Sequence, residues 1–164
     1  MTFADLIESL DFARQKTLAL VEAVAKEPDP RAALAYRPGP GRAHLGWQLM
    51  HVAATDDRHV HVRMTGGQPQ EPDHVRRFAG GSTPDEDVPT VEDIRAYLAE
   101  RRAALLQHLE DVEENQLGQK PNAAAPWTYR EWFKVLAWHE AHHQGQAHLT
   151  FNLYKAAHDT PGNP

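Results

Sequence analysis

Residues 128–157 read TYREWFKVLAWHEAHHQGQAHLTFNLYKAA and carry the period of one long amphipathic helix. Two signals mark the start of this helix: a T-x-x-E capping box formed by Thr128 and Glu131, and a hydrophobic staple formed by Trp127 and Trp132. The pattern predicts a helix over about 129–157, which ends before Pro161 because proline cannot continue a helix.

Three further segments have helical periodicity, and none predicts a convincing strand. Apolar residues recur at three- and four-residue steps over 3–24, over 43–64, and from an N-cap at Thr90 to Val112. The connections at 66–89 and 113–127 exceed the roughly 2–8 residues usual between neighbouring helices of a bundle. We therefore predict an all-α protein, a four-helix bundle in a single domain over 1–164, with at least one long crossover connection.

The most informative residues are 138–146, WHEAHHQGQ. Since each helical residue turns about 100°, His139 and His143 lie about 40° apart and one turn along. Two imidazoles so placed can reach one zinc-type ion at about 2.0–2.1 Å. The helical wheel centres the pair on the apolar stripe, so we interpret it as two metal ligands. The alternative is a pair of core histidines that hydrogen-bond within the bundle.

The same residues spell H-E-x-x-H, the pattern of zinc proteases, in which Glu140 would be the general base. The extended form of that pattern is absent, because Gly145 and His148 each come one residue early. No glutamate follows Glu140 as a further ligand. A protease is therefore a remote alternative, and we expect Glu140 in solvent or at the flank of the site.

A third ligand must come from another helix. The segment 43–64 offers His51, with His44 two turns earlier on nearly the same face, and both stay open at this point. Arg58 shares the face of His51 and could meet a carboxylate of a cosubstrate or form a surface ion pair. Gln146 could orient a ligand or be a buried amide. The remaining histidines that we expect in solvent are His59, His61, His74, His108 and His158.

Composition limits the possible functions. Apolar residues make up 41% of the 164, enough for one packed core, but their longest runs fall far short of the roughly 20 that a membrane span needs. The net charge of −6 argues against a nucleic-acid partner. The N-terminus lacks the apolar core of a signal peptide, so we expect a cytoplasmic protein without a membrane partner. With no cysteine, any thiol must arrive as a cosubstrate.

The order of these motifs resembles the DinB/YfiT-like superfamily of metalloenzymes, and the resemblance covers nearly the whole chain. Four elements carry it: the YRPGPG loop at 36–41, the Gly46-Trp47 pair with His51 after it, the helix start PTVEDI at 89–94, and His139-x-x-x-His143 followed by Gly145-Gln146.

This resemblance implies a four-helix bundle with three histidine ligands on one divalent metal ion, commonly zinc or nickel. The ligands map to His51, His139 and His143, with His44 as the alternative to His51. It also implies a homodimer and either a transferase that uses a low-molecular-weight thiol such as bacillithiol or mycothiol, or a hydrolase, acting on a small-molecule electrophile. The weaker catalytic candidates are Gln146, Glu140 and Arg58. Two alternatives are a non-catalytic, stress-related metal-binding bundle and a metal-free scaffold.

Overall fold

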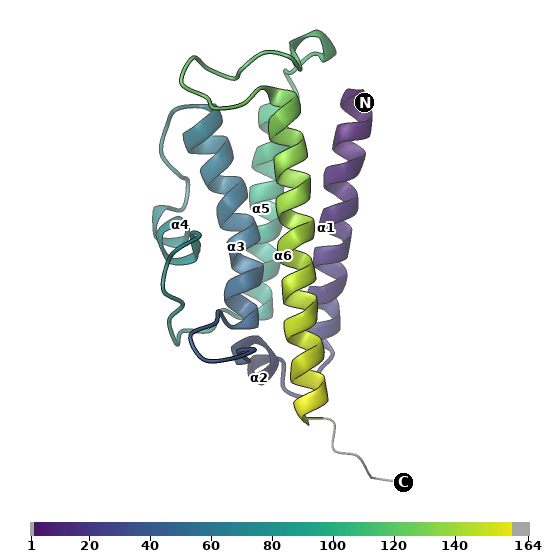
Figure 1. The fold of residues 1–164 in the computed structure, drawn as a ribbon, viewed down its shortest axis with the longest axis vertical. Coiled ribbons are helices and arrows are strands. Elements are labelled where there is room, and N and C mark those ends of the chain that lie inside the picture. The colour runs from purple at the N-terminus through teal and green to yellow at the C-terminus, as the bar shows by residue number, and fades with distance from the viewer. Residues whose placement is uncertain (1, 159–164) are drawn as a thin grey trace.

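Four long helices form the body of the protein (Figure 1). The computed structural model describes residues 2–158, and all regular elements within that range are helical. The long helices are α1 (Phe3–Ala25), α3 (Leu45–Asp57), α5 (Val91–Leu109) and α6 (Tyr129–His158), and a π-helical segment, η1 (Arg58–Met64), continues α3. Shorter elements are α2 (Pro30–Ala35), α4 (Pro72–Phe78) and the 3-10 turn η2 (Glu114–Gln116). The predicted all-α class is confirmed.

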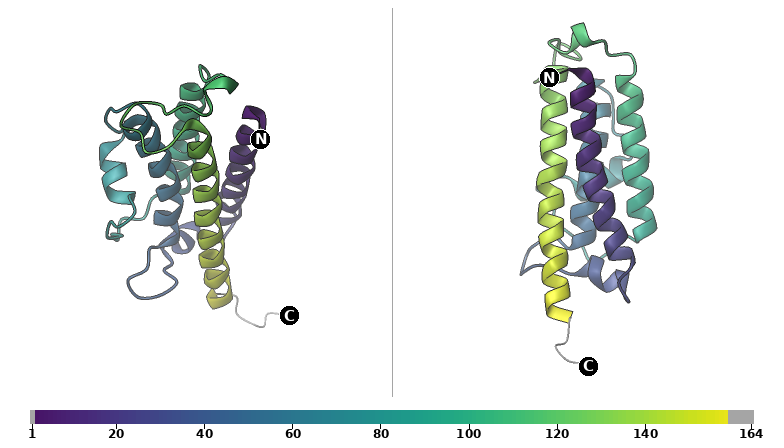
Figure 2. Two further views of the ribbon diagram at one scale, coloured as in Figure 1. Left: turned by 45° about the horizontal axis from the view of Figure 1, so that its top comes forward. Right: turned by 90° about the vertical axis from the view of Figure 1, so that its right-hand side faces the viewer.

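The long helices form a closed ring in which α1 contacts α6, α6 contacts α3, α3 contacts α5, and α5 contacts α1. In Figures 1 and 2, α1 and α6 run in one direction while α3 and α5 run in the other. Because the neighbours α3 and α5 are parallel, the chain between them must return along the whole bundle. Residues 65–90 make this return and carry α4 on the outside of the bundle. The predicted crossover connection is therefore present.

The predicted helix starts agree with the observed ones where capping boxes mark them. Thr128 accepts from the backbone of Glu131, whose carboxylate accepts from the Thr128 N–H at 2.8 Å. The rings of Trp127 and Trp132 meet edge to face at 4.5 Å between centroids, as the staple predicts. Thr90 caps α5 in the same way. Pro161, the predicted end signal of the last helix, lies outside the described residues.

Two short helices lie in segments for which the sequence predicts no helix. Both α2 and α4 have a proline in their first turn, Pro30 and Pro72, where the missing N–H costs no hydrogen bond. Pro30 is thus the first residue of α2. The predicted boundaries also shift in two places: α3 begins at Leu45 rather than 43, and α5 ends at Leu109 rather than 112.

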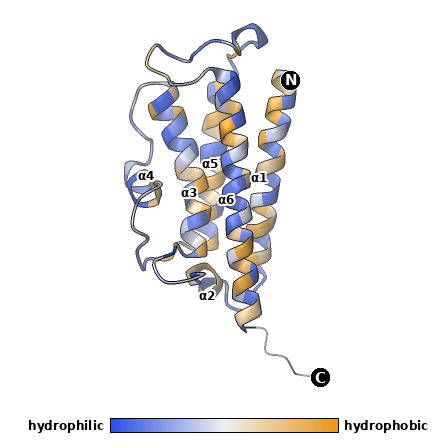
Figure 3. Cartoon of the chain, in the orientation of Figure 1, coloured by the Kyte–Doolittle hydropathy of each residue, from blue (hydrophilic) through white to orange (hydrophobic). Residues whose placement is uncertain are grey.

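The core consists of two apolar clusters with a polar layer between them. One cluster joins the end of α1, α2, α3, Phe78 of α4, the start of α5 and the end of α6. The other joins the start of α1, η1, the end of α5 and the start of α6. Between them lie four of the six charged side chains that are buried in the described residues, one from each long helix: Arg14, Asp56, Arg102 and Glu140. Figure 3 shows hydrophilic residues near the middle of α6, at this level. No helix within 2–158 is long and apolar enough to cross a bilayer.

Candidate metal centre

Three histidines converge where the middle of α3 faces the middle of α6. One ring nitrogen from each of His51, His139 and His143 lies within 4.8 Å of the other two. The Nε2 atoms of His51 and His139 are 3.2 Å apart, and His143 lies 4.3–4.4 Å from both rings between centroids. The structure thus brings together three of the side chains that the sequence singled out, across 88 residues of chain.

Local contacts fix the two helices against each other at this point. The Gln48 amide, one turn before His51, donates to the hydroxyl of Thr150 on α6 at 3.0 Å. The indole of Trp47 stacks on the His51 ring, with 5.0 Å between centroids and 7° between planes. His139 and His143, spaced four residues apart on α6, stand one above the other. The three rings are therefore held by packing on both helices.

The crossover segment orients His51. Its Nδ1 lies 2.6 Å from the carbonyl oxygen of Phe78, the last residue of α4. Because a carbonyl only accepts, Nδ1 carries the proton and donates it, which leaves the Nε2 lone pair directed at the cluster. Trp47 Nε1 donates to the carbonyl of Arg77 at 3.1 Å, so α4 also anchors the ring stacked on His51. Such outer contacts hold a metal-binding imidazole in its required orientation.

All three imidazoles are neutral near pH 7. Burial, and after it the neighbouring imidazoles, lower the pKa of His139 to about 3 and that of His143 to about 4. Burial also lowers the pKa of His51, against an opposing effect of its hydrogen bond to Phe78. Since a metal ion binds the unprotonated nitrogen, these rings are in the state that coordination requires.

The three histidines could hold one divalent ion, for which three protein ligands would leave a fourth tetrahedral position open. Two nitrogens at about 2.0–2.1 Å from a tetrahedral ion would be about 3.3 Å apart, close to the observed 3.2 Å between His51 and His139. A pocket of about 340 Å³ adjoins the cluster and could admit a small molecule. Besides the three histidines, its lining comprises Ala54, Thr55, Arg58, His59, Ala79 and Gly80.

His44, the alternative third ligand, has a structural role at the start of α3. It is the N-cap of α3, and its Nδ1 accepts the backbone N–H of Trp47 at 3.0 Å. That role ties the ring to the first turn of the helix, away from the other histidines. The alternative that His44 replaces His51 in the cluster is therefore wrong for this structure.

The expected position of Glu140 is also wrong. Its side chain is only 2% exposed and accepts from Arg14 Nε at 2.7 Å and from Arg102 Nη2 at 2.6 Å. Viewed down the axis of α6, the mean direction of its buried residues differs by about 50° from the direction midway between His139 and His143. The two histidines therefore lie at the edge of the buried stripe. Glu140, not the pair, lies near its centre.

This burial argues against the protease alternative. A general base must reach a water molecule beside the metal, whereas both Glu140 oxygens are bound to guanidinium groups. Residues 2–158 also contain no strand along which a peptide substrate could lie.

The two remaining candidates, Gln146 and Arg58, are both exposed. The Gln146 amide lies 3.0 Å from His142 Nε2 and lines a second pocket that also contains Trp47 and His143. The expectation of a buried amide is wrong. Arg58 lines the three-histidine pocket and forms no ion pair with any carboxylate among the described residues, so the surface ion pair is wrong too.

The expectation that His59 lies in solvent is wrong, because it is half-buried and lines the three-histidine pocket. Its Nδ1 lies 2.7 Å from the carbonyl of Thr55, its ring meets Trp132 edge to face, and burial lowers its pKa to about 4. Its position could have been predicted from the sequence, because His51, Thr55 and His59 follow one another at four-residue steps and so share one helix face. His61, His74 and His108 are likewise half-buried, while His158 is exposed as expected.

Comparisons with known proteins agree with this arrangement. The family model of the DinB superfamily matches residues 9–147. A DinB-like protein from Bacillus cereus has a similar structure, with a TM-score of 0.65 and 18% identity over 99% of this chain and 98% of that one. A conserved protein from Enterococcus faecalis also has a similar structure, with a TM-score of 0.63 and 20% identity over 93% of this chain and 97% of that one. Both likenesses concern the fold alone.

Among curated proteins no relative matches this chain. The family model, however, spans most of the chain, from the second turn of α1 to beyond both histidines of α6. The chain therefore belongs to the DinB superfamily.

Proposed function

We propose that this protein is a metal-dependent enzyme in which His51, His139 and His143 bind one divalent ion, zinc or nickel. The observation that carries the proposal is the convergence of three neutral imidazoles beside a pocket of about 340 Å³. Imidazole donors suit both metals. Three protein ligands with an adjoining pocket are typical of a catalytic site, whereas a structural zinc is normally enclosed by four.

The proposed reaction is a transfer to, or a hydrolysis of, a small electrophile. When bound, the ion would lower the pKa of a thiol or a water molecule at its open position. Since the chain has no cysteine, a thiol would enter as a low-molecular-weight cosubstrate. The protein's own contribution is orientation: Phe78 holds the His51 tautomer, and Trp47 stacks on the His51 ring. The Gln48–Thr150 hydrogen bond keeps α3 and α6 in register.

Metal titration tests the site itself. Protein stripped with EDTA is titrated with Zn²⁺ and Ni²⁺, alongside His51→Ala, His139→Ala and His143→Ala. His148→Ala is the matched control, because it removes an exposed imidazole from the same helix as two of the ligands. We expect one equivalent in the wild type and in the control, and an affinity at least about 100-fold lower in each ligand variant. Equal binding by all five proteins would refute the site.

A second experiment tests turnover. Zinc- and nickel-loaded protein is incubated with cysteine as a thiol and with an epoxide or an alkyl halide, and adducts are measured by mass spectrometry. Activated esters test hydrolysis in parallel. Products that disappear in His139→Ala support an enzyme. Metal that raises the melting temperature without any product would instead support the non-catalytic metal-binding bundle.

We further propose that the protein forms a homodimer through α6. Trp138 and Leu149 are 63% and 61% exposed, and with Leu153 they form an apolar stripe along one outer face of that helix. A second copy of the same stripe would cover it. Sedimentation velocity should give a dimer for the wild type and a monomer for Trp138→Glu, and a monomeric wild type would contradict the proposal.

A further inference from the structure

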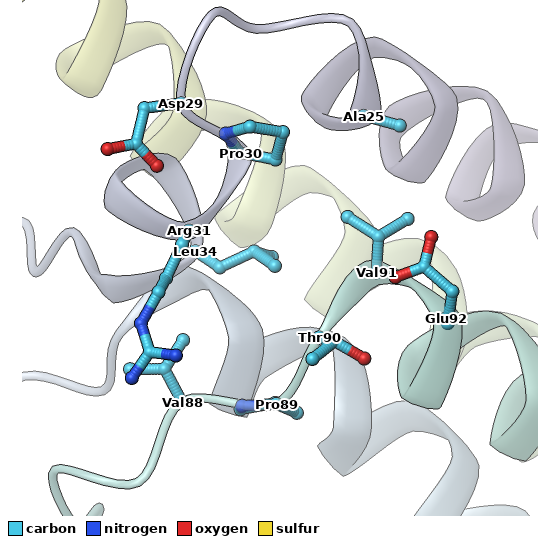
Figure 4. Close-up of a pocket in the computed structure, with 10 residues that line it drawn as sticks. All are labelled: Ala25, Asp29, Pro30, Arg31, Leu34, Val88, Pro89, Thr90, Val91 and Glu92. Carbon is cyan, nitrogen blue, oxygen red and sulfur yellow. The ribbon is translucent and has the colours of Figure 1, made fainter.

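The charge of the pockets distinguishes the three-histidine site from other hollows of the molecule. The pocket between α2 and the start of α5 contains the carboxylates of Asp29 and Glu92 (Figure 4). The hollow along α1 contains Glu8 and Asp11, and the one between α4 and α5 has four carboxylates. The three-histidine pocket has no acidic lining residue, although the chain carries a net charge of −6.

A second pocket without carboxylates adjoins it. This pocket of about 290 Å³ shares His143 with the three-histidine pocket and contains Arg42 as its one charged residue. The two hollows that meet at the candidate metal centre are therefore both free of negative charge, and each contains an arginine.

Arg58 is the arginine of the three-histidine pocket. It follows His51 by seven residues, two turns along the same face, and it starts η1, where the helix widens to the π form. Its guanidinium is exposed and pairs with no carboxylate in the described part of the chain. By contrast, Arg77 binds Asp85, and Arg95 binds Glu22 through two 2.8 Å hydrogen bonds.

These charges select a negatively charged ligand. The pocket holds a permanent cation and neutral imidazoles, and a bound divalent ion would add two further positive charges with no protein carboxylate to balance them. A planar guanidinium pairs best with a carboxylate, through two parallel charge-assisted hydrogen bonds. We propose that the small molecule bound beside the three histidines carries a carboxylate group and that Arg58 binds it. This inference rests on the proposed function and specifies its substrate class.

A matched pair of ligands tests the proposal. Zinc-loaded protein, freed of excess metal, is titrated calorimetrically with 3-mercaptopropanoate and with 3-mercaptopropanamide, which share a thiol and differ in the charge of the other end. The variants are Arg58→Gln, Arg58→Lys and, as control, Arg63→Gln. Arg63 is an exposed arginine of η1 that does not line the pocket. Comparing the ratio of the two affinities between variants cancels any intrinsic difference between the two thiols.

We expect the wild type and Arg63→Gln to prefer the carboxylate by about tenfold or more, the size of one charge-assisted contact. Arg58→Gln should lose the preference, and Arg58→Lys should retain part of it because the positive charge remains. Equal affinities in the wild type, or a preference that survives in Arg58→Gln, would overturn the proposal while leaving the metal site intact. A wild type that retains neither zinc nor nickel would refute the proposed function and this inference together.

Discussion

Replacing Glu140 with Gln should destabilise this protein far more than its position beside the metal-site histidines suggests. The carboxylate lies between two buried guanidinium groups, those of Arg14 and Arg102, whose side chains are only 7% and 9% exposed. Arg14 also binds Asp56 at 2.9 Å and the carbonyl of Leu98. The four charges balance, two positive and two negative, and they link all four long helices.

The magnitude follows from what remains after the charge is removed. Burial lowers the pKa of Arg14, but Asp56 and Glu140 outweigh this effect and leave it raised, so the guanidinium stays charged. Arg102 would lose its one close carboxylate, because the next ones, on Asp11 and Asp56, are 4.0 Å away. Breaking a buried ion pair on one side costs about 3–5 kcal/mol. Since Gln keeps the shape of Glu, we expect about 3 kcal/mol, a fall in Tm of about 6–12 °C.

Urea unfolding followed by circular dichroism measures this loss. Glu22→Gln is the matched control, because Glu22 makes a bidentate pair with Arg95 that is exposed to solvent and should contribute only about 0–1 kcal/mol. Adding Arg102→Met to Glu140→Gln removes the unpaired cation, and we expect it to recover about 1 kcal/mol or more. If Glu140→Gln were no less stable than Glu22→Gln, the argument that burial sets the cost would be refuted.

Three further predictions concern the crossover, pH and metal. Asp57 accepts the backbone N–H groups of Gln70 and Glu71 at 3.0 Å, so Asp57→Asn should cost about 1–3 kcal/mol and speed hydrogen exchange at those two amides. The lowered pKa values of His139 and His143, about 3 and 4, mean that the unfolded chain takes up their protons near pH 6.5 while the folded protein does not. Metal-free protein should therefore be fully stable above about pH 6.5 and lose stability as the pH falls toward 4, which urea midpoints at pH 7.5 and 5 would show, and His139→Ala should reduce the loss. Zinc at 100 times its Kd should raise the unfolding free energy by about 2.7 kcal/mol in the wild type and far less in His143→Ala.

The long helices could be predicted from the sequence because their signals are local. The Thr128–Glu131 and Thr90–Asp93 capping boxes each lie within four residues, and apolar periodicity extends over several turns. The short helices α2 and α4, of six and seven residues, are too brief to show a period. Each begins with a proline, which cannot lie inside a helix but is favoured in its first turn.

The candidate site was predictable only in part. His139 and His143 share one helix, so their spacing alone placed them together. His51 and His44 share a face of one helical pattern, and only the observed start of α3 separates them, because it makes His44 the N-cap. Glu140 was misplaced because its partners Arg14 and Arg102 lie 126 and 38 residues away, and no single sequence reveals such pairings.

The buried position of Glu140 also explains how the histidine cluster is held together. Asp56 follows His51 by five residues on α3, and Glu140 directly follows His139 on α6, so both helices of the histidine cluster also enter the ionic network. Arg14 binds both carboxylates and thereby ties α3 to α6 through α1. Buried charges tolerate little change in geometry, since a lost contact leaves a charge without compensation. The network therefore fixes the relative positions of the two helices beside the level at which the imidazoles must meet, and the charge that resembled a catalytic base instead holds the cluster in place.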